Sequence, residues 1–211
     1  NAMGGHSGDD IDKGRLNAVQ ALGNFLCAQI NAGKDLQLCS IDGGNKRNAI
    51  AREAEAIIAV ADASLFINDF IKFGEETGAV CRVNDPDVKF TVSETDTCET
   101  CIDSDTSYRL IRSLCAAPHG VLAMSPDIPG LVETSTNLAS VKMVSDGVIR
   151  IGTSQRSAIN SSRKEAALKV ETAFLLAGAE VTHESEYPGW KPNMDSRILD
   201  ITKNLYIKRF H

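Results

Sequence analysis

The chain has 211 residues, of which 43% are hydrophobic and 24% charged, a composition typical of a folded globular protein and not of a disordered one. Its net charge of −6, with no basic cluster beyond the doublet Lys46-Arg47, argues against nucleic acid as a partner. No apolar run reaches the roughly 20 residues of a membrane span and no leader precedes a cleavage site, so we expect a cytoplasmic protein without a membrane partner.

Residues 4–94 are predicted to form a first α+β half, after an expression scar at residues 1–3. Apolar residues at helical spacing predict helices over 13–30 and 64–77, the second with a buried stripe of Leu65, Phe66, Phe70 and Phe73. Alternating residues predict strands over 36–41, 48–61 and 88–94, with a turn at 42–45. With a first strand before residue 13, these five elements give the expected order β-α-β-β-α-β of ferredoxin-like folds.

Residues 95–106 are acidic and rich in Ser and Thr, which predicts a connection to a second half over 107–186. Within that half we expect helices over 107–117 and 161–177, an irregular Pro/Gly-rich loop through Gly130, and strands over 134–144, 147–154 and 180–185, with a hairpin turn at Ser145-Asp146-Gly147. The predicted fold is therefore α+β, with two tandem ferredoxin-like halves, each an antiparallel sheet with helices on one face. Open sheet edges in such a fold favour a homodimer.

The six cysteines are scattered through different predicted elements. Cys27 and Cys115 lie in helical patterns and Cys39 in a strand, which indicates buried reduced thiols and no disulfide framework. Cys98 and Cys101 have the spacing of half a zinc site, but no second pair follows at ligand distance. A small zinc module built on these two residues is the least favoured of the alternatives.

No nucleophile elbow, phosphate loop, dinucleotide fingerprint or His-Glu-x-x-His motif is present, so a self-contained catalytic site is not expected. His6 lies in a loop between glycines, where the backbone can approach closely and the imidazole is free to act. Asn48 follows a Gly-Gly turn, and Arg156 follows a predicted strand. An Arg and an Asn that converge on one point suit a carboxylate, because the guanidinium is a bidentate donor and the amide adds another.

Four segments resemble the lid domain of the aminoacyl-histidine dipeptidases, a family of two-zinc exopeptidases that includes carnosinase. The segments are Gly4–Ile11, Asp42–Glu53, Glu133–Leu138 and Tyr187–Trp190, in that order along nearly the whole chain. One departure is Ala51, where the family usually has Pro. The resemblance implies that residues 187–211 return the chain into a separate catalytic domain and that this sequence is a fragment of a longer one.

The resemblance also implies roles for the candidate residues. The catalytic domain, outside this sequence, would hold two zinc or other divalent ions and a Glu as general base, and no metal site is expected in this chain. His6 would stabilise the oxyanion, across the dimer in related enzymes, while Asn48 and Arg156 would bind the terminal carboxylate of an Xaa-His or other dipeptide. The chain alone would be inactive. The alternative is a non-catalytic ferredoxin-like binding or dimerisation module.

Overall fold

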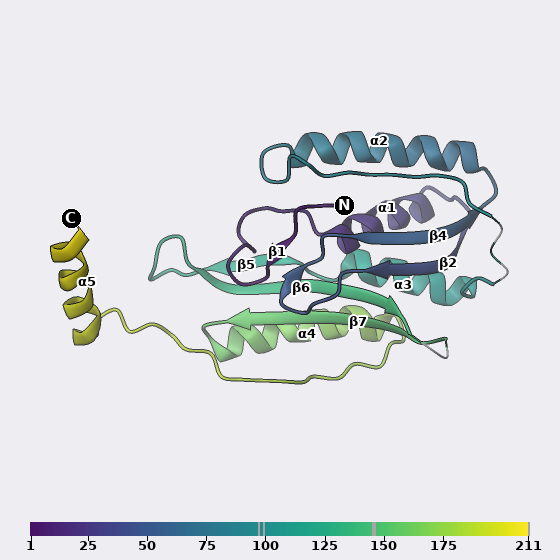
Figure 1. Cartoon of the computed structure of the whole chain (residues 1–211). Helices are drawn as coiled ribbons and strands as arrows, with labels where there is room; N and C mark the ends of the chain where they lie inside the picture. The colour runs from purple at the N-terminus through teal and green to yellow at the C-terminus, as the bar shows by residue number, and fades with distance from the viewer. Residues whose placement is uncertain (97, 99, 145–146, 211) are drawn as a thin grey trace.

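The fold is built on one five-stranded antiparallel sheet (Figure 1). The computed structural model describes residues 1–96, 98, 100–144 and 147–210. The strands of the sheet are β2 (Leu36–Gly43), β4 (Ala54–Val60), β5 (Gly120–Met124), β6 (Val132–Met143) and β7 (Ile149–Ser157). A separate two-stranded ladder joins β1 (Gly5–His6) to β3 (Ala49–Ile50).

Strand β6 pairs with strands from both predicted halves of the chain. Along one side it pairs with β7, and along the other it pairs with β5 at its start and with β2 near its end. The junction between the halves consists of the pairs Asp42 with Lys142 and Gly43 with Val141. Lys142 Nζ also lies 2.5 Å from Asp42 Oδ1, which links the two strands by an ion pair. The two predicted halves therefore contribute strands to one sheet.

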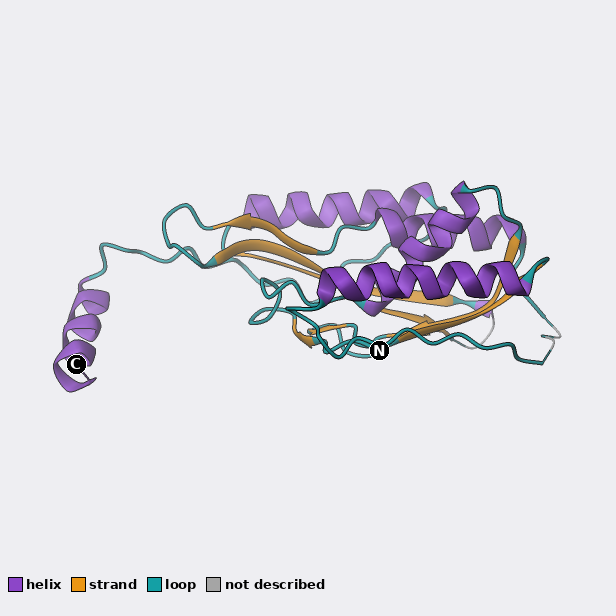
Figure 2. Ribbon diagram, turned by 90° about the horizontal axis from the view of Figure 1, so that it is seen from above, coloured by secondary structure: helices purple, strands orange, loops and turns teal. Residues whose placement is uncertain are grey.

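Helices cover one face of this sheet, and the N-terminal loops lie on the other (Figure 2). The covering helices are α1 (Ala18–Asn31), α3 (Ser104–Ala116) and α4 (Asn160–Leu176). Helix α2 (Ala63–Cys81) lies beyond the β4 edge, where Phe66, Phe70 and Phe73 pack within 5.3 Å, centroid to centroid, of the Phe25 ring of α1. The α+β class, with an antiparallel sheet and helices on one face, is confirmed.

Local signals explain where the helices begin. Asn17 accepts a hydrogen bond from the backbone N–H of Gln20, so α1 starts after Asn17 and not at residue 13. Asp62 and Asp103 cap α2 and α3 in the same way. Of the predicted stripe on α2, the three phenylalanines face the core, but Leu65 is 47% exposed and was wrongly assigned to it.

Two of the predicted strands are wrong. Residues 88–94 form no strand: Phe90 packs on Phe70 and Phe73, and Lys89 exchanges backbone hydrogen bonds with Asn1. The alternation of apolar and polar residues in this segment therefore reflects the packing of Phe90 on α2, and not pairing in a sheet. Residues 180–185 also form no strand, and run as a largely exposed extended segment after α4. Neither half thus completes the four-stranded ferredoxin-like order.

The predicted loop before Gly130 contains a strand instead. Residues 120–124 form β5, which pairs antiparallel with β6, and Ser125 N donates to Leu131 O at 2.8 Å to close the hairpin. The predicted strand over 48–61 is divided into β3 and β4, with residues 51–53 between them. Ser145 and Asp146 of the predicted hairpin turn lie outside the described residues, although Val144 and Val148 on either side are hydrogen-bonded.

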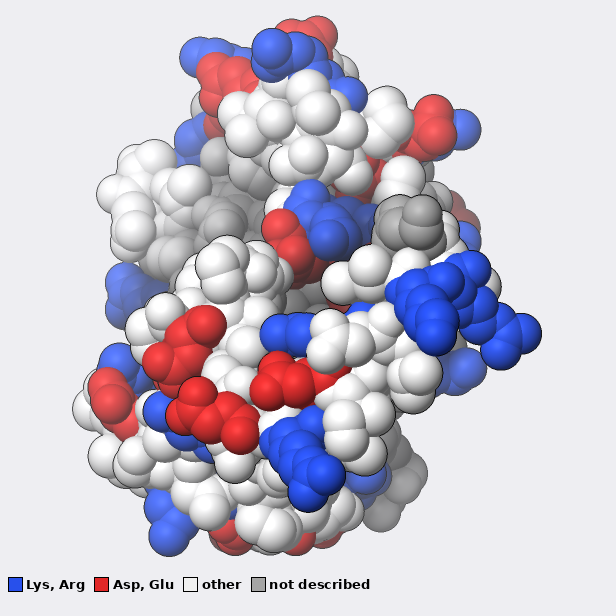
Figure 3. All heavy atoms as spheres, turned by 90° about the vertical axis from the view of Figure 1, so that its left-hand side faces the viewer, with Lys and Arg blue, Asp and Glu red and all other residues white. Residues whose placement is uncertain are grey.

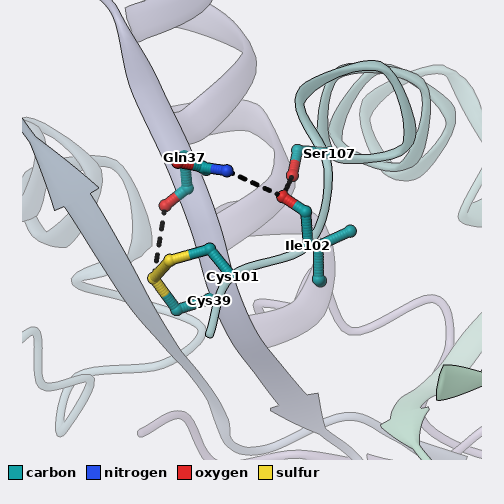
Figure 4. The surroundings of a disulfide bond; sticks show 5 residues. All are labelled: Gln37, Cys39, Cys101, Ile102 and Ser107. Carbon is teal, nitrogen blue, oxygen red and sulfur yellow. Dashed lines mark hydrogen bonds between the residues drawn. A yellow bond between two sulfur atoms is a disulfide. The ribbon is translucent and has the colours of Figure 1, made fainter. Parts of the chain in front are cut away.

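The sequence predicted a reduced thiol at Cys39, and this prediction is wrong. Cys39 forms a disulfide with Cys101 (Figure 4). The bond attaches the connection before α3 to a part of β2 that has no strand beside it on the β6 side. Two hydrogen bonds support this attachment: the backbone N–H of Ile102 donates to Leu38 O at 2.8 Å, and the side-chain Nε2 of Gln37 donates to Ile102 O at 3.3 Å. The disulfide also contradicts a zinc module built on Cys98 and Cys101. Cys27 and Cys115 are free, as expected.

The C-terminal helix α5 (Arg197–Phe210) stands apart from the sheet at the end of an extended segment (Figure 1). None of its residues is buried, and its apolar side chains, among them Ile198 and Leu205, are exposed. Within the described residues, no helix combines the length and the apolar character needed to cross a membrane. The predicted division of the chain at residues 94, 106 and 186 stays a prediction.

Candidate functional site

The loop that carries His6 is held in place by a small polar cage. The backbone N–H of His6 donates to Asp10 Oδ2 at 2.8 Å, and Arg15 Nη1 lies 3.1 Å from the same oxygen. Arg15 also donates to the carbonyl of Gly4 at 2.8 Å. Gly4 has a φ of +66°, and a Cβ there would lie 2.8 Å from the Cβ of Arg52, so only glycine fits this position without a shift. The backbone around His6 is therefore well defined.

The hydrogen bonds of the His6 ring favour one tautomer. Nδ1 accepts from the backbone N–H groups of Gly8 at 3.3 Å and Asp9 at 3.2 Å. Nδ1 also lies 3.1 Å from Asp9 Oδ2, but that side chain is 88% exposed, and we give more weight to the two fixed backbone donors. We therefore assign the proton to Nε2, which makes Nε2–H a donor on a side chain that is 41% exposed.

Arg156 of β7 reaches the same loop from the sheet. It is paired with Ser135 of β6, and residues paired across an antiparallel ladder lie on the same face. A Cβ added to Gly8 would lie 3.1 Å from His6 Cε1 and 3.4 Å from Arg156 Nη1, so the glycine lets both side chains approach the loop. Within the described part of the chain, Arg156 Nε is buried without a hydrogen-bond partner. The structure brings two of the three candidate residues together.

The backbone of Asn48 contacts the loop that carries His6. Its carbonyl accepts from the N–H of Ser7 at 2.9 Å, and the next residue, Ala49, is paired with His6. The residue itself is exposed, so its amide is available to a ligand. His6, Asn48 and Arg156 thus come from β1, the turn before β3, and β7, on the sheet face opposite the helices. Sequence reasoning did not single out Asn137, whose amide bonds this turn.

The arrangement is suited to binding anionic groups. It combines an Nε2–H donor, the guanidinium of Arg156 and an exposed amide. No group of three His, Cys, Asp or Glu side chains placed to hold a metal ion occurs among residues 1–96, 98, 100–144 and 147–210. On the end of the molecule seen in Figure 3, basic and acidic side chains are intermingled.

Comparisons with known proteins agree on one kind of relative. Residues 1–72 match the family model of a peptidase dimerisation domain. The chain is 32% identical over 213 aligned positions to a cytosol non-specific dipeptidase of Escherichia coli (strain K12), and 99% of this chain aligns with 43% of that protein.

A solved structure extends the likeness to the fold. The crystal structure of an aminoacylhistidine dipeptidase from Vibrio alginolyticus matches the whole chain with a TM-score of 0.92 and 32% identity, and the match covers 43% of that protein. The chain therefore spans less than half the length of the relatives it matches.

Proposed function

We propose that this chain is a peptidase dimerisation domain of the dipeptidase family, and that it forms the lid of a metal-dependent enzyme that hydrolyses Xaa-His and other dipeptides. The two metal ions, zinc in this proposal, and the general base are assigned to the remainder of the enzyme. The contribution of this chain is to bind the substrate and stabilise developing charge, so the 211-residue chain alone is inactive.

One observation carries the proposal: His6 and Arg156, which are 150 positions apart, approach the same glycine, Gly8. A dipeptidase must recognise a free C-terminal carboxylate and must also stabilise the oxyanion that forms in the transition state. Nε2–H of His6 is a donor for the oxyanion, either in the same subunit or across a dimer. Arg156 and the amide of Asn48 are donors for the carboxylate.

The proposed enzyme is a homodimer. The family model that matches residues 1–72 describes a dimerisation domain, and β4 forms an edge of the sheet. Beside that edge, α2 exposes Leu65 (47%), Ile71 (49%) and Val80 (81%), an apolar surface of the kind that a second subunit covers. Analytical ultracentrifugation tests this directly, and a full-length enzyme that sediments as an active monomer would contradict it.

We also propose a cytoplasmic location, in agreement with the name of the Escherichia coli relative. The Cys39–Cys101 disulfide weighs against it, because stable disulfides are rare in reducing compartments. Thiol counting on enzyme taken directly from cells would decide how much of the disulfide forms there.

The test of the catalytic role uses His6→Ala in the full-length enzyme. We expect turnover to fall about 100- to 1000-fold, the usual effect of removing one oxyanion donor, while zinc content stays at the wild-type level. His183→Ala is a matched control, because His183 is an exposed histidine on the segment after α4. Normal turnover of His6→Ala would overturn the assignment.

A second variant tests the carboxylate site. Arg156→Ala should lower kcat/KM for dipeptides with a free C-terminus much more than for their C-terminal amides. If the variant discriminates between the two as sharply as the wild type does, Arg156 does not bind the carboxylate. If the full-length protein has no dipeptidase activity, the alternative of a non-catalytic binding and dimerisation module is favoured.

A further inference from the structure

The turn that carries Asn48 is held by one side chain from the sheet, Asn137. This residue lies in β6 and is only 1% exposed. Its amide nitrogen donates to the carbonyl of Arg47 at 3.2 Å and to the carbonyl of Ala49 at 2.8 Å. An amide has two N–H donors, and here both are used on the carbonyls of the two residues that flank Asn48. The backbone position of Asn48 is therefore set by Asn137.

The same contact reaches the His6 loop. Asn48 O accepts from Ser7 N at 2.9 Å, and His6 pairs with Ala49 in the β1–β3 ladder. A shift of the turn would move both bonds and the imidazole with them. Asn137 thus supports the turn at Asn48, and that turn supports the His6 loop.

Asn137 also lies on the sheet face that carries Arg156. Side chains alternate along a strand, so Ser135 and Asn137 share one face of β6, and Arg156 is paired with Ser135. Thr136 and Leu138 occupy the other face, where Leu138 belongs to the core under the helices. One rigid strand therefore sets the spacing between the guanidinium and the turn with Asn48.

The side-chain oxygen of Asn137 indicates that the two N–H donors of this amide are what the position requires. Its Oδ1 is buried and has no hydrogen-bond partner among the described residues, as is also true of Ser7 Oγ. An unpartnered buried oxygen costs stability, which an apolar side chain of similar size would avoid. An apolar residue could not bind the two carbonyls, and an aspartate would set its oxygens against them.

We propose that Asn137 is a positioning residue of the dipeptide site, which places Asn48 and the His6 loop relative to Arg156. This inference rests on the proposed function of that site. Asn137 does not contact the substrate and acts only through the backbone of residues 47–49.

The test uses the full-length enzyme with Asn137→Asp, which keeps the shape but removes both donors, and Asn137→Ala as a second variant. We expect kcat/KM for a dipeptide to fall about 100-fold, the order of effect that a displacement of about 1 Å at a reacting centre produces. Thr136→Val is the matched control, since Thr136 is also 1% exposed in β6 but its hydroxyl accepts from Gln155. The control should retain activity within about threefold.

A double-mutant cycle separates positioning from general damage. If Asn137 acts through the two site residues, then Asn137→Ala should have little further effect in a His6→Ala, Asn48→Ala background, because the groups it positions are gone. A full additional loss in that background would overturn the inference, as would wild-type kinetics of both single variants. The proposed function fails separately, if His6→Ala and Asn48→Ala are themselves fully active.

Discussion

Acidification should destabilise this domain through one histidine, His119, which lies between α3 and β5. Its Nδ1 accepts from the backbone N–H of Leu138 at 3.3 Å, and Asn17 Nδ2 lies at the same distance. Asn17 Nδ2 also donates to Leu138 O at 2.7 Å, so its second hydrogen is available to the ring. A proton on Nδ1 would point at two other donors, and the folded state therefore favours the neutral ring.

Burial lowers the pKa of His119 from its ordinary value of 6.5 to about 4. Between these two values the unfolded chain binds a proton that the folded chain does not, so stability rises with pH in this window. The contribution is fully present above pH 6.5 and is lost as the pH falls to about 4. At about 1.4 kcal/mol per pH unit, this difference corresponds to about 3 kcal/mol of unfolding free energy.

The assay is urea unfolding of the 211-residue chain between pH 7 and pH 4, for the wild type and for His119→Asn. Asparagine can still accept from Leu138 N but does not titrate in this range. Other groups also respond to acid, such as Asp103, whose pKa is lowered by its hydrogen bond from the Thr106 backbone N–H. Those groups are common to both proteins and cancel in the difference.

We expect the unfolding free energy of the wild type, relative to the variant, to drop by about 3 kcal/mol between pH 7 and pH 4, with most of the drop below pH 6.5. A difference that stays constant over this range would instead mean that His119 has the same pKa in the folded and unfolded chains.

Two further predictions concern stability at neutral pH. Reduction of the Cys39–Cys101 disulfide, which spans 62 positions, should lower the unfolding free energy by about 4 kcal/mol in the chain-entropy account, as measured by urea unfolding with and without dithiothreitol. Cys39→Ser should show the same loss and no response to dithiothreitol, and an equal response in this variant would contradict the assignment. Gly44→Ala should cost about 2 kcal/mol or more, because φ is +59° and the new Cβ would meet the carbonyl oxygen of Ala139. Gly33→Ala, at φ +75° with nothing within 4 Å, should cost only about 1 kcal/mol, and equal losses in a thermal melt would exclude the clash.

The sequence was most informative where structure depends on near neighbours. The phenylalanines of α2 and the alternation over 134–144 predicted a helix and a strand that the structure contains. The sequence-based predictions failed where the structure depends on contacts between residues that are far apart along the chain. Phe90 lies in a segment with the alternating pattern of a strand, but its ring packs on α2. Cys39 forms a disulfide with Cys101, which is 62 positions away. No local pattern distinguishes such a cysteine from a buried thiol.

The candidate site shows the same limit. His6, Asn48 and Arg156 were singled out from their residue types, and the structure brings His6 and Arg156 together at Gly8. Whether they perform the proposed roles stays a prediction. Asn137 stands within one of the resembling segments, but its two bonds reach back about 90 positions, to residues 47 and 49, and spacing along the chain gives no sign of them.

The two faces of strand β6 have different roles. One face packs in the core under the helices, and the other supports the candidate site. Leu138 is fully buried under the helices, and its backbone is bonded by His119 and Asn17. Asn137, the adjacent residue, points to the opposite face and holds the turn of Asn48. Since neighbouring residues of a strand move together, the packing that fixes Leu138 also fixes Asn137. Substitutions on the helix-facing side of β6 should therefore lower stability first, and those on the other side should lower activity while the fold persists.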